Sequence, residues 1–123
     1  MKTFFLIISL LVSTLTTNKE YDYSEFNGSW VSESDNYTMV ISVKDNKNIS
    51  IYNYYFIPSK NKYKQIENVE ETVVKIKNKK IFTKVYREAN NHNVNVIYEI
   101  IEYNKMKATF VDDWTGVIYY TKK

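Results

Sequence analysis

The stretch Phe26-Asn27-Gly28-Ser29-Trp30 lies between an N-terminal apolar segment and a long series of β-patterned runs. We interpret it as the opening of the first strand of a small β-barrel. A glycine in a strand permits a close backbone approach or a bulge. Trp30 follows two residues later and therefore shares a face with Gly28 in an extended strand. The alternate positions are mostly polar, which predicts that Gly28 and Trp30 face inward.

The N-terminal segment has the layout of a secretory signal peptide. Lys2 supplies a positive charge, and residues 4–12 form an apolar run of about nine residues, the length of a signal-peptide hydrophobic region. A membrane-spanning helix needs roughly 20 apolar residues. We therefore expect residues 1–18 to be a signal peptide and residues 19–123 to form a single domain. The alternative is that this segment is a buried first strand or helix.

The composition restricts the compartment in which we expect the protein and the kinds of partner that it binds. The chain has no cysteine and a formal net charge of +3. A small secreted domain without disulfides favours a bacterial protein, secreted or periplasmic, with a self-sufficient core. A charge of this size serves solubility and is not the footprint of a nucleic-acid-binding protein. We expect no nucleic-acid partner and no transmembrane segment in the mature chain.

The rest of the chain alternates apolar and polar residues with a period of two, which is typical of half-buried strands. Short turns join successive runs, and short connections favour antiparallel neighbours. We predict an all-β fold, an eight-stranded antiparallel up-and-down meander that closes into a small barrel. The expected strands are residues 26–33, 37–44, 48–57, 69–77, 80–88, 94–103, 106–112 and 117–121. Residues 58–71 also allow a short strand near 63–66 or a single helical turn.

Two short motifs carry a resemblance to a known family. Gly28-Ser29-Trp30 and the closing Asp112-Asp113-Trp114-Thr115-Gly116-Val117-Ile118-Tyr119-Tyr120 resemble small secreted bacterial lipocalin-like (calycin-type) β-barrel proteins. The resemblance implies a barrel with Gly28 and Trp30 at its closed end and a small apolar ligand at the other end. In that family an arginine often packs on the tryptophan. The only arginine here, Arg87, lies on the fifth expected strand and does not fit that position.

Strand alternation assigns a set of inward-facing positions. These are Trp30, Met39, Ile41, Val43, Val74, Ile76, Ile81, Thr83, Val85, Val96, Tyr98, Ile100, Met106, Ala108 and Phe110. The candidate ligand-binding residues among them are Met39, Ile41, Val43, Val96, Tyr98, Ile100 and Phe110. Such bulky side chains fill most of an eight-stranded barrel and leave room for a small ligand at most.

No catalytic or metal-binding motif is readable. His92 is the only histidine and lies in an asparagine-rich run, and no zinc-ligand spacing occurs. Two carboxylate pairs, Glu70/Glu71 and Asp112/Asp113, are adjacent in sequence, and neighbours on a strand point to opposite faces. We predict that the protein is not an enzyme and has no cofactor and no metal site.

The sequence leaves two functions open. One is a carrier of a small apolar ligand in the barrel interior. The other is a protein-binding module, such as a secreted inhibitor or adhesion-type factor, with a packed core. Such a module would use outward aromatic residues, for which the alternation assigns Tyr52, Tyr54, Phe82 and Tyr86. Trp114 is expected in an exposed turn.

Overall fold

The structure is a computed structural model of the chain, and it describes residues 20–34, 36–67, 69–88, 91–111 and 116–123. The expected signal peptide, Trp114 and the pair Asp112/Asp113 lie outside the described residues. The elements are η1 (Tyr23–Phe26), β1 (Gly28–Ser32), β2 (Tyr37–Asp45), β3 (Asn48–Ile57), η2 (Pro58–Lys60), β4 (Lys62–Gln65), β5 (Val69–Lys77), β6 (Lys80–Arg87), β7 (His92–Glu102), β8 (Lys105–Phe110) and β9 (Gly116–Lys122).

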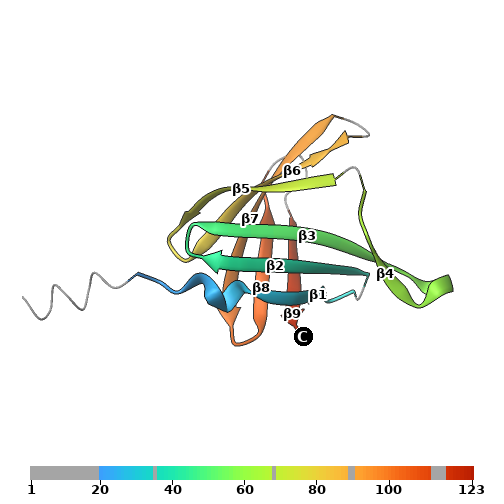
Figure 1. Cartoon of the computed structure of the whole chain (residues 1–123), viewed down its shortest axis with the longest axis horizontal. Helices are drawn as coiled ribbons and strands as arrows, with labels where there is room; N and C mark the ends of the chain where they lie inside the picture. Colours follow the sequence, from blue (N-terminus) through green and yellow to red (C-terminus); the bar gives the residue numbers. More distant parts are fainter. Residues whose placement is uncertain (1–19, 35, 68, 89–90, 112–115) are drawn as a thin grey trace, which may run out of the picture.

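The strands of the described residues form one curled antiparallel sheet in the order β4-β3-β2-β1-β9-β8-β7-β6-β5. β1 pairs with both β2 and β9, which brings the start and the end of the chain together. The all-β prediction is confirmed. The prediction of eight strands closing into a barrel is wrong, because the sheet has nine strands and its two ends, β4 and β5, do not pair. The result is a half-barrel (Figure 1).

The additional strand comes from the ambiguous segment after β3. Pro58 has no N–H to donate, so the ladder ends at Ile57 and the chain makes the short 3₁₀ turn η2. Asn61 then adopts a left-handed conformation with φ of 50°, and β4 returns to pair with the last four residues of β3. Both alternatives for this segment, a turn and a short strand, are therefore present. Because β4 is so short, it leaves most of the β3 edge facing β5 without a ladder.

The first strand begins later than expected. Phe26, predicted to open the strand, is the last residue of η1. The Asp22 side chain accepts a hydrogen bond from the Ser24 N–H (3.0 Å), which caps this 3₁₀ turn. The Asn27 N–H donates to the Ser24 carbonyl (3.0 Å) and closes it. The turn drives the fully buried Phe26 side chain into the interior.

A β-bulge in β5 changes which valine faces inward. The register between β5 and β6 shifts between Val73 and Lys75, and an extra residue reverses the alternation beyond it. Val73 therefore packs against the core, whereas Val74 is 63% exposed. The prediction that Val74 faces inward is wrong for this reason, while Ile76 regains the inward face beyond the bulge.

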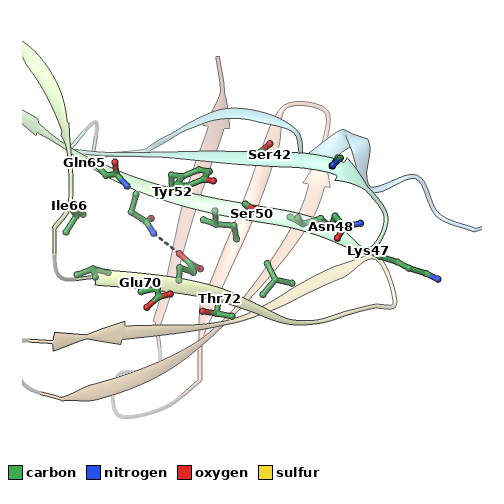
Figure 2. Close-up of a pocket in the computed structure, with 16 residues that line it drawn as sticks. Ser42, Lys47, Asn48, Ser50, Tyr52, Gln65, Ile66, Glu70 and Thr72 are labelled. Carbon is green, nitrogen blue, oxygen red and sulfur yellow. Dashed lines mark hydrogen bonds between the residues drawn. The ribbon is translucent and has the colours of Figure 1, made fainter.

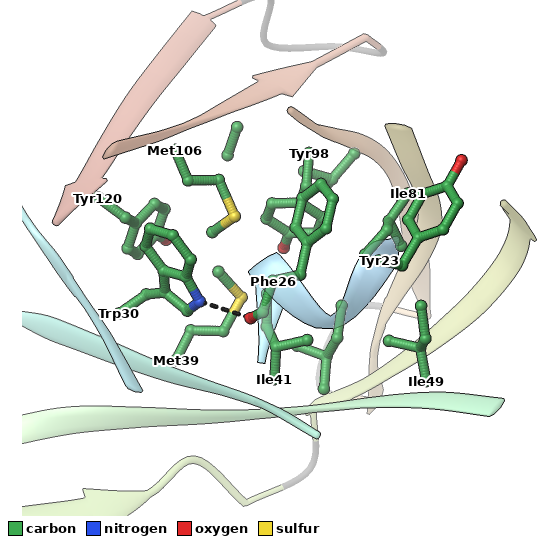
Figure 3. Packing of buried hydrophobic residues seen from close by; sticks show 13 residues of the cluster. Tyr23, Phe26, Trp30, Met39, Ile41, Ile49, Ile81, Tyr98, Met106 and Tyr120 are labelled. Carbon is green, nitrogen blue, oxygen red and sulfur yellow. Dashed lines mark hydrogen bonds between the residues drawn. The ribbon is translucent and has the colours of Figure 1, made fainter. Parts of the chain in front are cut away.

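The hydrophobic core fills the concave side of the sheet (Figure 3). Phe26, Trp30, Met39, Ile41 and Ile81 are at most 1% exposed. Apart from Val74, the predicted inward positions are confirmed as buried or packed against this core. They are Trp30, Met39, Ile41, Val43, Ile76, Ile81, Thr83, Val85, Val96, Tyr98, Ile100, Met106, Ala108 and Phe110.

Candidate functional site

The half-barrel has a seam where β3 and β5 run beside each other without ladder pairing. A cavity of about 630 Å³ follows this seam, and we call it the seam groove (Figure 2). Its lining includes inward-facing residues of both strands, Ile49, Ile51, Asn53, Val69, Glu71 and Val73. Lys44 and Lys47 line it near the β2–β3 turn, and Gln65 and Ile66 line it near β4. Outward-facing residues of β3 and β5, Ser50, Tyr52, Glu70 and Thr72, also line it, so the groove joins an aliphatic wall to polar side chains around Glu71.

Glu71 accepts hydrogen bonds from three uncharged side chains. The Asn53 amide on β3 donates to Glu71 Oε1 (2.8 Å), the bond drawn across the seam in Figure 2. The Thr83 hydroxyl on β6 donates to Oε2 (2.7 Å), and the Tyr98 hydroxyl on β7 donates to the same oxygen. Thr83 and Tyr98 are buried, and Glu71 itself is half-buried. The carboxylate therefore connects β3, β5, β6 and β7.

The hydrogen-bond donors to Glu71 that the structure describes are neutral groups. Within the parts of the chain that the structure describes, no lysine, arginine or histidine forms an ion pair with it. Burial, followed by the nearby negative charge of Glu71, raises the pKa of Tyr98 well above its usual value. The same two causes raise the pKa of Tyr120 to about 12. The cluster therefore holds neutral phenols beside a carboxylate group, and perturbed groups of this kind gather at functional sites.

Tyr23 holds the two sides of the seam together at the turn end. Its N–H donates to the Asn46 side-chain oxygen in the β2–β3 turn (3.1 Å). Its hydroxyl accepts a hydrogen bond from the Lys79 N–H in the β5–β6 turn (3.1 Å). The Asn46 amide also donates to the Tyr21 carbonyl (3.0 Å). Side chains thus replace the missing ladder here, as Asn53 and Glu71 do further along the seam.

Trp30 lies beside η1 in the packed interior (Figure 3). Its indole N–H donates to the Phe26 carbonyl (2.8 Å), which gives the buried indole a hydrogen-bond partner. Lys122 places its ammonium 5.4 Å from the centre of the Trp30 ring and donates to the Glu25 carbonyl (3.0 Å). The cation over the tryptophan is therefore a lysine of the last strand rather than the arginine of the resembled family. Sequence reasoning did not identify Lys122.

The predicted ligand-binding residues belong to the packed interior. Met39, Ile41, Val96 and Tyr98 are buried in the core cluster, and Val43, Ile100 and Phe110 pack against it. The structure brings these residues together, and of the seven, Tyr98 is the one that donates a hydrogen bond to Glu71. Their role in binding a ligand stays a prediction, as does the barrel-closing role of Gly28 and Trp30.

The residues considered for chemistry are separated. His92 begins β7 opposite Arg87 and is not among the residues that line the seam groove. Glu70 is exposed whereas the Glu71 carboxylate turns toward Thr83 and Tyr98, in agreement with the expectation that the pair points to opposite faces. Among the described residues, no group of three or more His, Cys, Asp or Glu side chains is arranged to hold a metal ion.

Comparisons with protein-family models, curated proteins and solved structures find no match for this chain. The fold and the groove therefore define the protein at the level of a class, an all-β half-barrel with a carboxylate cluster at its seam. No helix among the described residues is long and apolar enough to cross a membrane.

Proposed function

We propose that the protein is a non-enzymatic binding protein that takes a small ligand in the seam groove. The observation that carries the proposal is the groove of about 630 Å³ beside the preorganised Glu71 cluster. A concave site with an apolar wall and a few convergent polar groups is the usual form of a small-molecule site. The ligand would lie against Ile49, Ile51 and Val69 and meet the polar groups at one end.

The packing of the interior supports the groove as the ligand site over the centre of the half-barrel. The five core residues Phe26, Trp30, Met39, Ile41 and Ile81 are almost completely excluded from solvent. A ligand in their place would have to displace well-packed side chains, which costs about as much as a large core substitution, 2–5 kcal/mol. A small apolar ligand, as the lipocalin-like resemblance implies, would therefore use the aliphatic wall of the groove.

The test is to identify what the mature protein binds and where it binds. The protein is purified from the cells that naturally produce it and examined by native mass spectrometry. Bound molecules are then extracted and identified. Addition of that ligand to ligand-free, ¹⁵N-labelled protein should shift the amide resonances of Ile51, Asn53 and Glu71. Shifts confined to the outer face of β8 would contradict the groove assignment, and so would the absence of any bound molecule.

We also propose that the chain is a secreted or periplasmic protein with the lipocalin-like architecture that its two motifs resemble. The apolar N-terminal run supports the export proposal. A fusion of residues 1–25 to a reporter that is active only after export tests it. A reporter that remains inside the cell would contradict it.

A second candidate function, a protein-binding module, is favoured by the exposed tyrosines. Tyr52 is 45% exposed on the outer face of β3, and Tyr37 and Tyr55 are also exposed. Tyrosine is enriched in protein interfaces because its ring supplies contact area at low entropic cost. The other predicted outward aromatics, Tyr54, Phe82 and Tyr86, are half-buried. A partner whose binding is lost in Tyr55→Ser, at a position that does not line the groove, but kept in Glu71→Gln would favour this function over the groove ligand.

A further inference from the structure

We infer that the seam groove selects a ligand with a cationic ammonium group, which pairs with Glu71 while its hydrocarbon part lies along the aliphatic wall. The inference rests on the proposed function and deepens it by naming the class of ligand. It follows from the charge balance and the hydrogen-bond geometry of the groove.

The first step concerns the hydrogen-bond capacity of Glu71. Each carboxylate oxygen accepts about two hydrogen bonds. Oε2 receives the hydroxyl groups of Thr83 and Tyr98. Oε1 receives one bond, from the Asn53 amide, and Asn53 lines the groove together with Glu71. Oε1 therefore keeps capacity for one further donor on the groove side of the cluster.

The second step concerns charge. All of the donors to Glu71 that the structure describes are neutral, so they orient the carboxylate without neutralising it. Besides Glu71, the charged residues that line the groove are Glu70, which is exposed on the outer face of β5, and Lys44 and Lys47 at the turn end. Lys44 follows Val43, which pairs with Ile49, and Ile49 is four residues from Asn53. Lys47 is six residues from Asn53. At a strand rise of about 3.3 Å per residue, both lysines therefore lie roughly 13–20 Å from Asn53 along β3. Exposed charges at that separation are screened in physiological salt, where the Debye length is about 8 Å.

The lysine at the other end of the seam is also engaged elsewhere. Lys64 pairs with Glu67 (3.9 Å), and both side chains are largely exposed. A ligand ammonium would therefore be the first cation to reach Glu71 within the described part of the chain. A charge-assisted hydrogen bond to a half-buried carboxylate is stronger than a neutral one, and half-burial keeps the desolvation of the pair modest.

The third step concerns the remainder of the ligand. Ile49, Ile51, Val69 and Val73 line the groove beside Glu71. An aliphatic chain attached to the ammonium would remove this surface from water, at roughly 25 cal/mol for each Å² buried. The chemistry of the groove thus fits a monoalkyl ammonium better than a fatty acid, whose carboxylate would face the negative charge of Glu71.

The experiment compares three probes that share one chain length: n-hexylammonium, 1-hexanol and hexanoate. Each is titrated into the ¹⁵N-labelled mature protein, and the dissociation constant is taken from the amide shifts of Asn53, Glu71 and Thr83. We expect hexylammonium to bind about tenfold or more tightly than hexanol, which corresponds to the extra strength of a charge-assisted bond. We expect hexanoate to bind more weakly still.

Two variants make the test specific to Glu71. Glu71→Gln keeps the size of the side chain and removes the charge, and it should abolish the preference for hexylammonium over hexanol. Glu33→Gln removes the same charge from an exposed residue that does not line the groove and should change the preference less than threefold. Equal losses in the two variants would overturn the inference, because they would indicate unspecific attraction. Circular dichroism of both variants confirms that each is folded.

The outcomes also separate this inference from the proposed function. If hexanol or hexanoate binds as tightly as hexylammonium, the ammonium inference is overturned while a small-ligand function stands. If none of the three probes shifts the groove amides, the ammonium inference is overturned as well. The mass-spectrometric search for a native ligand then decides the proposed function by itself.

Discussion

The indole N–H of Trp30 donates a 2.8 Å hydrogen bond to the main-chain carbonyl of Phe26, and both side chains are almost completely buried. The bond connects the first strand to the 3₁₀ turn that precedes it. It gives a buried polar group a partner inside an otherwise apolar cluster, as burial requires. The most conspicuous aromatic residue of the first strand is thereby anchored by a turn that lies outside the sheet.

Replacement of Trp30 should be among the most destabilising single changes. Trp30→Ala removes a large buried side chain and should lower the free energy of unfolding by about 3–5 kcal/mol. Trp30→Phe keeps most of the apolar volume and leaves the Phe26 carbonyl without its donor, so it should cost about 1–3 kcal/mol. Urea denaturation of both variants measures the difference. Equal, small losses in the two variants would contradict the anchoring role.

The backbone conformation of Gly28 leads to a second prediction. Its φ is +134°, a conformation that residues with a Cβ rarely adopt, and a Cβ there would lie 2.8 Å from Lys122 Cε. Gly28→Ala should cost about 1–3 kcal/mol because of backbone strain. Since the flexible Lys122 side chain is able to move aside, the same cost should remain in a Lys122→Ala background. A cost that disappears in that background would identify the contact, and not the backbone, as its cause.

Substitutions of two adjacent valines test the bulge in β5. Val73 packs against the core and Val74 is 63% exposed. Val73→Asp should therefore lower the free energy of unfolding by well over 1 kcal/mol, because it places a charge in an apolar environment. Val74→Asp should change it by no more than about 0.5 kcal/mol. If thermal or urea denaturation showed Val74→Asp to be the more destabilising variant, β5 would alternate without a bulge, and the prediction would be wrong.

The hydrogen bond across the seam should contribute measurably to stability. Asn53→Ala removes the amide that donates to Glu71 Oε1 and should cost about 1.5–3 kcal/mol, the range for bonds to charged groups. Asn93→Ala, at an exposed position of β7, serves as the control and should stay within about 0.5 kcal/mol. Native-state hydrogen exchange should also become faster in β5 of the Asn53 variant. Unchanged exchange together with unchanged stability would mean that the seam does not depend on this bond.

Stability should fall at alkaline pH because of the buried phenol of Tyr120. Burial and the charge of Glu71 raise the pKa of Tyr120 to about 12, whereas an unfolded tyrosine loses its proton near pH 10. Between these values the unfolded state binds fewer protons, so the free energy of unfolding decreases as pH rises, by about 2–3 kcal/mol in total. Below pH 10 this group contributes no pH dependence. Tyr98 acts in the same direction.

Urea denaturation at several pH values between 9 and 12 measures this effect. Tyr120→Phe should make the decline less steep, because the titrating phenol is removed. Tyr103→Phe, whose side chain is 92% exposed, should leave the decline unchanged. An equally steep decline in all three proteins would assign it to other groups.

The inward face of most strands could be predicted from the sequence, because alternation depends only on local strand geometry. Met39 and Ile41 on β2 and Val96 and Tyr98 on β7 all lie where alternation places them. Val74 was misplaced because a bulge is one extra residue whose position depends on the partner strand. Phe26 was misplaced because the Asp22 cap favours a 3₁₀ turn that the apolar pattern does not reveal.

The candidate site was largely beyond sequence reasoning. That Glu70 and Glu71 point to opposite faces could be predicted, but which of them meets other polar groups could not. Thr83 and Tyr98 come from β6 and β7, the two strands next to β5 in the sheet. Asn53 comes from β3, far from β5 in the strand order, and reaches Glu71 only because the sheet curls. Lys122 reaches Trp30 because β1 pairs with β9, which places these two residues from opposite ends of the chain directly across from each other.

The sequence by itself determined the all-β class, most of the strand limits and most of the core, because strand period, turn residues and Pro58 act over a few neighbouring residues. Only the tertiary structure decided that the sheet stays open between β3 and β5. Closure depends on whether two distant edges come into register. Here those edges stay unpaired, and hydrogen bonds of Tyr23, Asn53 and Glu71 hold the seam instead.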